Sequence, residues 1–163
     1  MVRDVDGDGD VDLVTDRLIR NTTHSPPDGG RRRQIGAGSP GTGGLVPTLG
    51  ADGPFRVGES AELRIRGGVS GANGLLTIFR VGESAHALSG NGMLTATPER
   101  ILTQIPFTLS GAAGAAGTGS WTLPYTVGGH FAGQTRRYVA EIYDTGGVNG
   151  VVRSNSLLIT YGP

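Results

Sequence analysis

Near the start of the chain, five aspartates alternate with valine and glycine, from Asp4 to Asp12. Ca²⁺ takes about six to eight oxygen ligands, and closely spaced carboxylates on a tight loop supply them. The first three aspartates fall at positions 1, 3 and 5 of such a loop, and Gly9 falls at position 6, where the chain must turn sharply. The sequence therefore predicts a calcium site whose ligands are Asp4, Asp6, Asp8, Asp10 and Asp12.

The loop differs from an EF-hand, because position 12 holds Thr15 instead of glutamate and no helix pattern flanks it. The alternative is a solvated acidic terminus, since residues 1–16 contain six aspartates and one arginine. Without calcium, repulsion between the carboxylates should leave this segment frayed. We expect calcium to act here as a structural ion.

Residues 4–21 resemble the end of a calcium-binding FG-GAP or VCBS-type repeat, in which the aspartate loop is followed by Arg17-Leu18-Ile19-Arg20-Asn21. The resemblance implies the five aspartates as the ligand set and an extracellular or cell-surface setting. Residues 35–161 resemble the C-terminal β-sandwich domain of large secreted bacterial repeat proteins, for which no catalytic activity is implied. A propeller needs several blades, and this chain holds only the closing part of one.

The segments that follow this loop have the sequence patterns of β-strands. Alternating apolar and polar residues predict strands with one buried face, and glycine clusters separate them. The fold class is therefore an all-β, immunoglobulin-like or jelly-roll-type β-sandwich of seven to nine strands, with an N-terminal calcium loop and strand arm. The clearest predicted strands lie at 61–66, 75–81, 101–109, 121–127, 138–142 and 157–161, with shorter candidates at 46–49 and 93–97.

Composition divides the chain into three parts. Residues 1–21 form the calcium loop and strand arm, residues 22–44 a Gly/Pro/Arg linker, and residues 45–163 the sandwich. Glycines 36, 38 and 41 match G-x-G-x-x-G literally, but Pro40 and further glycines follow where a dinucleotide site needs a helix, so the linker interpretation holds. The run Arg31–Arg33 is either solvated or contacts an acidic partner, phosphate or lipid, and pairing with the Asp-rich loop of a neighbouring subunit is a variant of the second alternative. Asn21-Thr22-Thr23 makes Asn21 a candidate glycosylation site.

Composition also limits the function classes. The formal charge is +0, so nothing predicts nucleic-acid binding. No apolar run reaches the roughly 18 residues of a membrane span, the start lacks a signal-peptide core, and the absence of cysteine excludes disulfides. The three histidines lie far apart, the glutamates are scattered, and no G-x-S-x-G motif occurs. We expect a protein that is not an enzyme.

Two functions remain open. In the first, the protein is an extracellular structural or assembly protein. Its calcium-stiffened arm, with Leu13, Val14, Leu18 and Ile19 as the assembly strand, adds to a neighbouring subunit's sheet edge and builds a homo-oligomer or fibre. In the second, the protein is an adhesion or carbohydrate-binding module of a larger secreted propeller protein, with a cell-surface or polysaccharide partner. Exposed aromatics in a groove would favour the second; Tyr143 is the best candidate, because Trp121, Tyr125 and Tyr138 fall on predicted inward faces.

Overall fold

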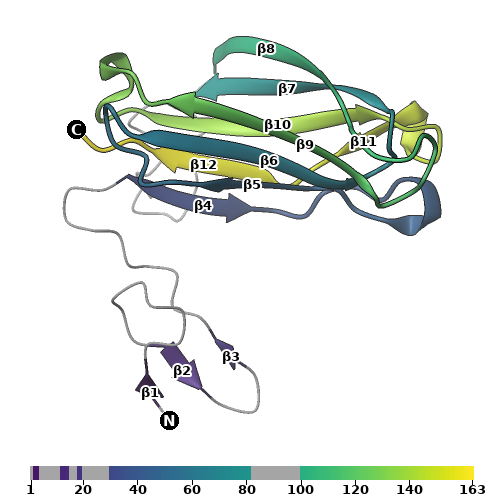
Figure 1. The fold of residues 1–163 in the computed structure, drawn as a ribbon, viewed down its shortest axis with the longest axis horizontal. Coiled ribbons are helices and arrows are strands. Elements are labelled where there is room, and N and C mark those ends of the chain that lie inside the picture. The colour runs from purple at the N-terminus through teal and green to yellow at the C-terminus, as the bar shows by residue number, and fades with distance from the viewer. Residues whose placement is uncertain (1, 4–11, 15–17, 20–29, 82–99) are drawn as a thin grey trace, which may run out of the picture.

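The computed structural model describes residues 2–3, 12–14, 18–19, 30–81 and 100–163, and for the first seven of these only the backbone. Every regular element among the described residues is a strand or a short 3-10 turn (Figure 1). The strands are β1 (Val2–Arg3), β2 (Asp12–Val14), β3 (Leu18–Ile19), β4 (Arg31–Ile35), β5 (Thr48–Asp52), β6 (Ser60–Gly68), β7 (Asn73–Arg80), β8 (Arg100–Thr108), β9 (Gly119–Thr126), β10 (Thr135–Tyr143), β11 (Val151–Arg153) and β12 (Ser156–Thr160); the 3-10 turns are η1 (Thr42–Gly44), η3 (Gly129–Phe131) and η4 (Val148–Gly150).

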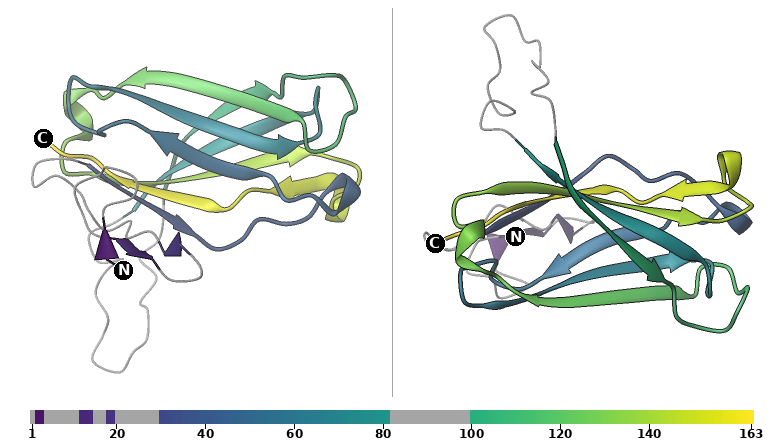
Figure 2. Two further views of the ribbon diagram at one scale, coloured as in Figure 1. Left: turned by 60° about the horizontal axis from the view of Figure 1, so that its bottom comes forward. Right: turned by 90° about the horizontal axis from the view of Figure 1, so that it is seen from above.

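Nine of these strands form two antiparallel sheets that pack as layers (Figure 2). The larger sheet has the order β4-β12-β10-β7-β8, with β11 also paired to β10, and the smaller sheet has the order β5-β6-β9. The predicted β-sandwich of seven to nine strands is thereby confirmed. The arrangement is immunoglobulin-like, because β5, β6 and β9 correspond to strands A, B and E, and β7, β10 and β12 to strands C, F and G.

The core lies between the two sheets and follows from the alternation read in the sequence. On β6, Leu63 and Ile65 are buried while their neighbours are not, and on β10 Tyr138, Ala140 and Ile142 are buried in the same way. Because consecutive strand residues point to opposite faces, each of these strands contributes one apolar row to the core. The smaller sheet has fewer strands than the larger one, so the inward residues of β9 are only half-buried.

A one-residue bulge joins β11 to β12 and ties the sheets together. The pairing with β10 shifts by one residue between Arg153↔Glu141 and Leu157↔Tyr138, which leaves Asn155 outside the regular pairing. Its side-chain oxygen accepts a hydrogen bond from the N–H of Leu49 (2.8 Å), and its side-chain nitrogen donates to the Leu49 carbonyl (2.9 Å). The amide thus replaces a neighbouring strand at the outer edge of β5, which keeps buried backbone groups satisfied.

The linker predicted over residues 22–44 is wrong for the part that the structure describes. Arg31–Ile35 forms β4, which pairs with the whole of β12, and the sandwich therefore begins near residue 30 instead of residue 45. All five residues of β4 are exposed. Because an edge strand of this kind buries neither face, its sequence carries no apolar alternation to reveal it.

The single predicted face from residue 101 to residue 109 is also interrupted. The pairing of β7 with β8 changes register between Ile78↔Thr103 and Phe79↔Ile101, so that Leu102 is the extra residue of a bulge. Paired residues share a face, and Ile101 therefore lies with Phe79 on the outer face, where it is 54% exposed. The short strand predicted at 93–97 lies outside the described residues.

Candidate functional site

Four of the five predicted calcium ligands, Asp4, Asp6, Asp8 and Asp10, lie outside the described residues, as does Asn21. The backbone of Asp12 lies in β2, directly opposite Arg3 of β1. The two ends of the aspartate-rich segment are therefore adjacent, which is compatible with a compact ion-binding loop. The calcium site stays a prediction.

The segment from Leu13 to Arg20 is not the single unpartnered strand that the sequence suggested. Leu13 and Val14 lie in β2, and they pair with Ile19 and Leu18 of β3. On its other side β2 pairs with β1. Both edges of β2 are thus occupied within the chain, and donation of Leu13 and Val14 to another subunit would require the β1-β2-β3 sheet to open.

The aromatic residues divide between core and surface as the alternation predicted. Tyr138 is buried, and its hydroxyl contacts that of Tyr161, which in turn contacts the Tyr125 hydroxyl at 2.9 Å. Burial raises the pKa of Tyr138 and of Tyr161, and this hydroxyl cluster serves packing. Trp121 and Tyr125 are half-buried, whereas Tyr143, at the end of β10, is 52% exposed.

Tyr143 borders a surface groove of about 460 Å³ at one end of the larger sheet. Ile142, Gly74 and Phe107 are paired across β10, β7 and β8 and face the core. The alternation therefore places the neighbouring side chains of Tyr143, Leu75 and Pro106 on the outer face. The residues that line the groove are Asn73, Gly74, Leu75, Pro106, Phe107, Thr108, Trp121 and Tyr143.

On the core side of the strands that carry the groove, a glycine and two aromatic rings pack closely together. A Cβ on Gly74 would lie 2.4 Å from the tip of the Phe107 ring, so only glycine fits beneath it. The Phe107 ring stacks on Trp121, with centroids 5.0 Å apart and an interplanar angle of 30°. At the rim, the Thr108 hydroxyl donates a hydrogen bond of 2.7 Å to the Asn73 side-chain oxygen. The groove thus combines apolar walls with a few fixed polar groups, the usual composition of small-molecule sites.

The sequence pointed to Tyr143 but missed the other groove residues. Asn73, Leu75, Pro106 and Thr108 belong to two strands whose register brings them together across β7 and β8. The available signal was Pro106, since proline within a strand pattern indicates an edge strand, and β8 is the edge of its sheet.

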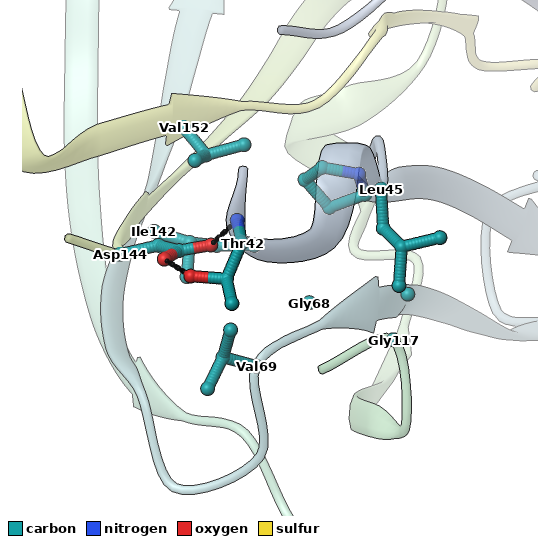
Figure 3. Close-up of a pocket in the computed structure, with 10 residues that line it drawn as sticks. Thr42, Leu45, Gly68, Val69, Gly117, Ile142, Asp144 and Val152 are labelled. Carbon is teal, nitrogen blue, oxygen red and sulfur yellow. Dashed lines mark hydrogen bonds between the residues drawn. The ribbon is translucent and has the colours of Figure 1, made fainter. Parts of the chain in front are cut away.

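A second cluster, around Asp144, is a closed structural junction (Figure 3). Asp144 is 7% exposed. Its carboxylate accepts hydrogen bonds from the Thr42 N–H (2.8 Å), the Thr42 hydroxyl and the Gly146 N–H (2.9 Å). Burial acts to raise the pKa of Asp144, but these hydrogen bonds outweigh it and lower the pKa below its ordinary value. The surrounding space leaves no room for a water molecule, and the hydrogen bonds of Asp144 anchor residues 41–44 to the sandwich.

Within residues 30–81 and 100–163, no three acidic or histidine side chains come together as a metal site would require. His130 packs against the Phe131 ring, with centroids 4.3 Å apart. The carboxylates of Asp52, Glu62 and Glu141 form ion pairs with arginines on the sandwich surface. The prediction that the protein is not an enzyme stays a prediction.

The part of the chain that the structure describes contains no helix of the length and hydropathy needed to cross a bilayer. Comparison with protein-family models, with curated proteins and with solved structures finds no match for this chain. The likeness to FG-GAP or VCBS-type repeats and to secreted sandwich domains therefore stays an expectation from the sequence.

Proposed function

We propose that this protein is a non-enzymatic binding module that holds a carbohydrate in the groove beside Tyr143. The observation that carries the proposal is an exposed aromatic ring next to an apolar, polar-rimmed groove on a rigid sheet. An extracellular setting and a calcium-bound N-terminal loop belong to the same proposal as expectations from the sequence.

The chemistry of the groove fits a sugar ring better than a charged or wholly apolar ligand. One face of a pyranose presents C–H groups, which pack on an aromatic face such as that of Tyr143. Leu75 and Pro106 extend the same apolar outer face. The hydroxyls around the sugar ring need fixed hydrogen-bond partners, and Asn73 and Thr108 supply donors and acceptors at the rim.

Strand donation is the weaker of the two functions that the sequence left open. Its motivation was a free strand over residues 13–20, whereas β2 and β3 pair with each other. The binding function required an exposed aromatic residue in a groove. Tyr143 is such a residue and therefore supports the binding function.

The test is affinity electrophoresis and titration calorimetry of the full chain with a panel of neutral, soluble plant, fungal and bacterial polysaccharides. We expect Tyr143→Ala to weaken binding at least tenfold. Because Tyr143 is exposed, its replacement should change stability by less than about 0.5 kcal/mol. The matched control is Val148→Ala, which removes another exposed apolar side chain, 77% exposed and outside the groove. The proposal is wrong if no glycan in the panel binds to the unmodified chain. It is also wrong if Tyr143→Ala and Val148→Ala bind the glycan with the same affinity.

A further inference from the structure

Three arginines lie in one row across three neighbouring strands of the larger sheet. Arg136 of β10 pairs with Arg80 of β7, and Arg80 pairs with Arg100 of β8. Neighbouring strands are about 4.8 Å apart, and directly paired residues share a face. The three arginines therefore start from adjacent positions on one face of the sheet, and like charges directly opposite each other are destabilising when nothing compensates them.

The row extends from the sandwich interior to its open side. Arg136 also pairs with Ile159, which is fully buried, so the row lies on the face that carries the core. Arg136 is half-buried, whereas Arg80 and Arg100, toward the edge strand β8, are exposed. An ion or ligand from solution can therefore reach the row.

Nothing in the described part of the chain neutralises this row. Arg80 and Arg100 form no ion pair with any described residue, whereas Arg32, Arg64 and Arg153 all do. The acidic residues between β7 and β8, Glu83 and Glu99, lie outside the described residues.

Arg136 supplies a second, independent indication of a missing partner. Its guanidinium carbon lies 3.8 Å from the centre of the Phe131 ring, and one terminal nitrogen donates to the Gln134 side-chain oxygen at 3.2 Å. Its Nε is buried and has no hydrogen-bond partner among the residues that the structure describes. A buried donor without an acceptor is costly. An oxyanion bound beside the exposed Arg80 and Arg100 would add negative charge next to Arg136.

We infer that Arg80, Arg100 and Arg136 form a binding site for an anionic polysaccharide that carries sulfate or carboxylate groups. The planar guanidinium fork matches the paired oxygens of both groups, and such charge-assisted contacts are stronger than neutral ones. The inference rests on the proposed function for the nature of the chain that carries the anions. An acidic peptide would present carboxylates of the same chemistry, and the test separates the two.

The test compares retention of the full chain on immobilised dextran sulfate and on unsulfated dextran of the same length. We expect retention on the sulfated polymer only, decreasing as salt rises because salt screens the exposed charges. The double variant Arg80→Gln/Arg100→Gln should bind at least tenfold more weakly. The matched control, Arg31→Gln/Arg33→Gln, removes the same charge from exposed positions of β4 and should lose less than twofold.

Three results would overturn the inference. Equal losses in both double variants would mean that only net charge matters. Failure of the unmodified chain to bind dextran sulfate would show that the three arginines do not form the inferred binding site. Stronger competition by polyaspartate than by soluble dextran sulfate would assign the row to an acidic peptide. Each result can be told apart from a failure of the proposed carbohydrate site in the groove. The variant Tyr143→Ala leaves the three arginines unchanged, and its effect is measured as binding to neutral glycans.

Discussion

The junction at Asp144 allows a quantitative test of how the N-terminal edge is attached to the sandwich. We consider the substitution Asp144→Asn, which preserves size but replaces one acceptor oxygen by an NH₂ group. In the folded protein one carboxylate oxygen accepts from the Thr42 N–H, and the other accepts from the Thr42 hydroxyl and the Gly146 N–H. In either orientation, the asparagine amide places a donor against a donor.

The expected cost follows from the loss of a buried, charged hydrogen-bond network. Hydrogen bonds to charged groups contribute about 1.5–3 kcal/mol, and leaving a buried donor unsatisfied costs about 1–3 kcal/mol. Since the amide keeps part of the network, we expect a loss of about 2–4 kcal/mol in the free energy of unfolding. For a chain of this length, that loss lowers the melting temperature by roughly 5–12 °C.

The assay is urea denaturation at neutral pH, in which the midpoint should fall while the slope stays constant. The control is Asp52→Asn, the same change at a side chain that is 51% exposed and forms ion pairs with Arg32 and Arg64. Exposed ion pairs contribute about 0–1 kcal/mol, so the control should lose much less. If the two substitutions cost the same, the junction does not anchor the edge.

The pH dependence supplies a second check on the same junction. The pKa of Asp144 is lowered from 3.8 in the folded protein, so the unfolded chain binds its proton more readily than the folded one. The stability that this group contributes is therefore complete above pH 3.8 and is lost as the pH falls through the lower, folded pKa. The unmodified protein should lose more stability than Asp144→Asn on acidification; parallel pH curves would refute the argument.

Two further predictions concern the sheets and the N-terminal loop. Asn155→Ala should lower the free energy of unfolding by about 2–4 kcal/mol, because it leaves backbone groups of β5 without partners; Gln34→Ala, on the exposed β4, should change it by less than about 0.5 kcal/mol in the same urea titration. Titration calorimetry with CaCl₂ should show one calcium site on the full chain, weakened at least tenfold by Asp6→Asn/Asp8→Asn; unchanged affinity would exclude the aspartate loop as the site.

The groove residues show why the candidate site was only partly predictable. The alternation of apolar and polar residues on β10 was sufficient to predict that Tyr143 is exposed, because its neighbour Ile142 faces the core. Leu75 and Pro106 came to line the same groove only because the register of β7 and β8 pairs them and places β7 beside β10. A shift of one residue reverses the face of every side chain on a strand, and the sequence of a single strand does not state its register.

The sequence by itself determined that this protein is all-β, which strands carry the core and where an aspartate-rich loop stands. These features depend on local chemistry, namely period-two alternation, glycine at turns and closely spaced carboxylates. Only the tertiary structure decided that β4 belongs to the sandwich, that Thr42 meets Asp144 across 102 residues and that three arginines align. The physical reason is that strand pairing joins residues far apart in the chain, and exposed or hydrogen-bonded residues leave no apolar pattern that would reveal their partners.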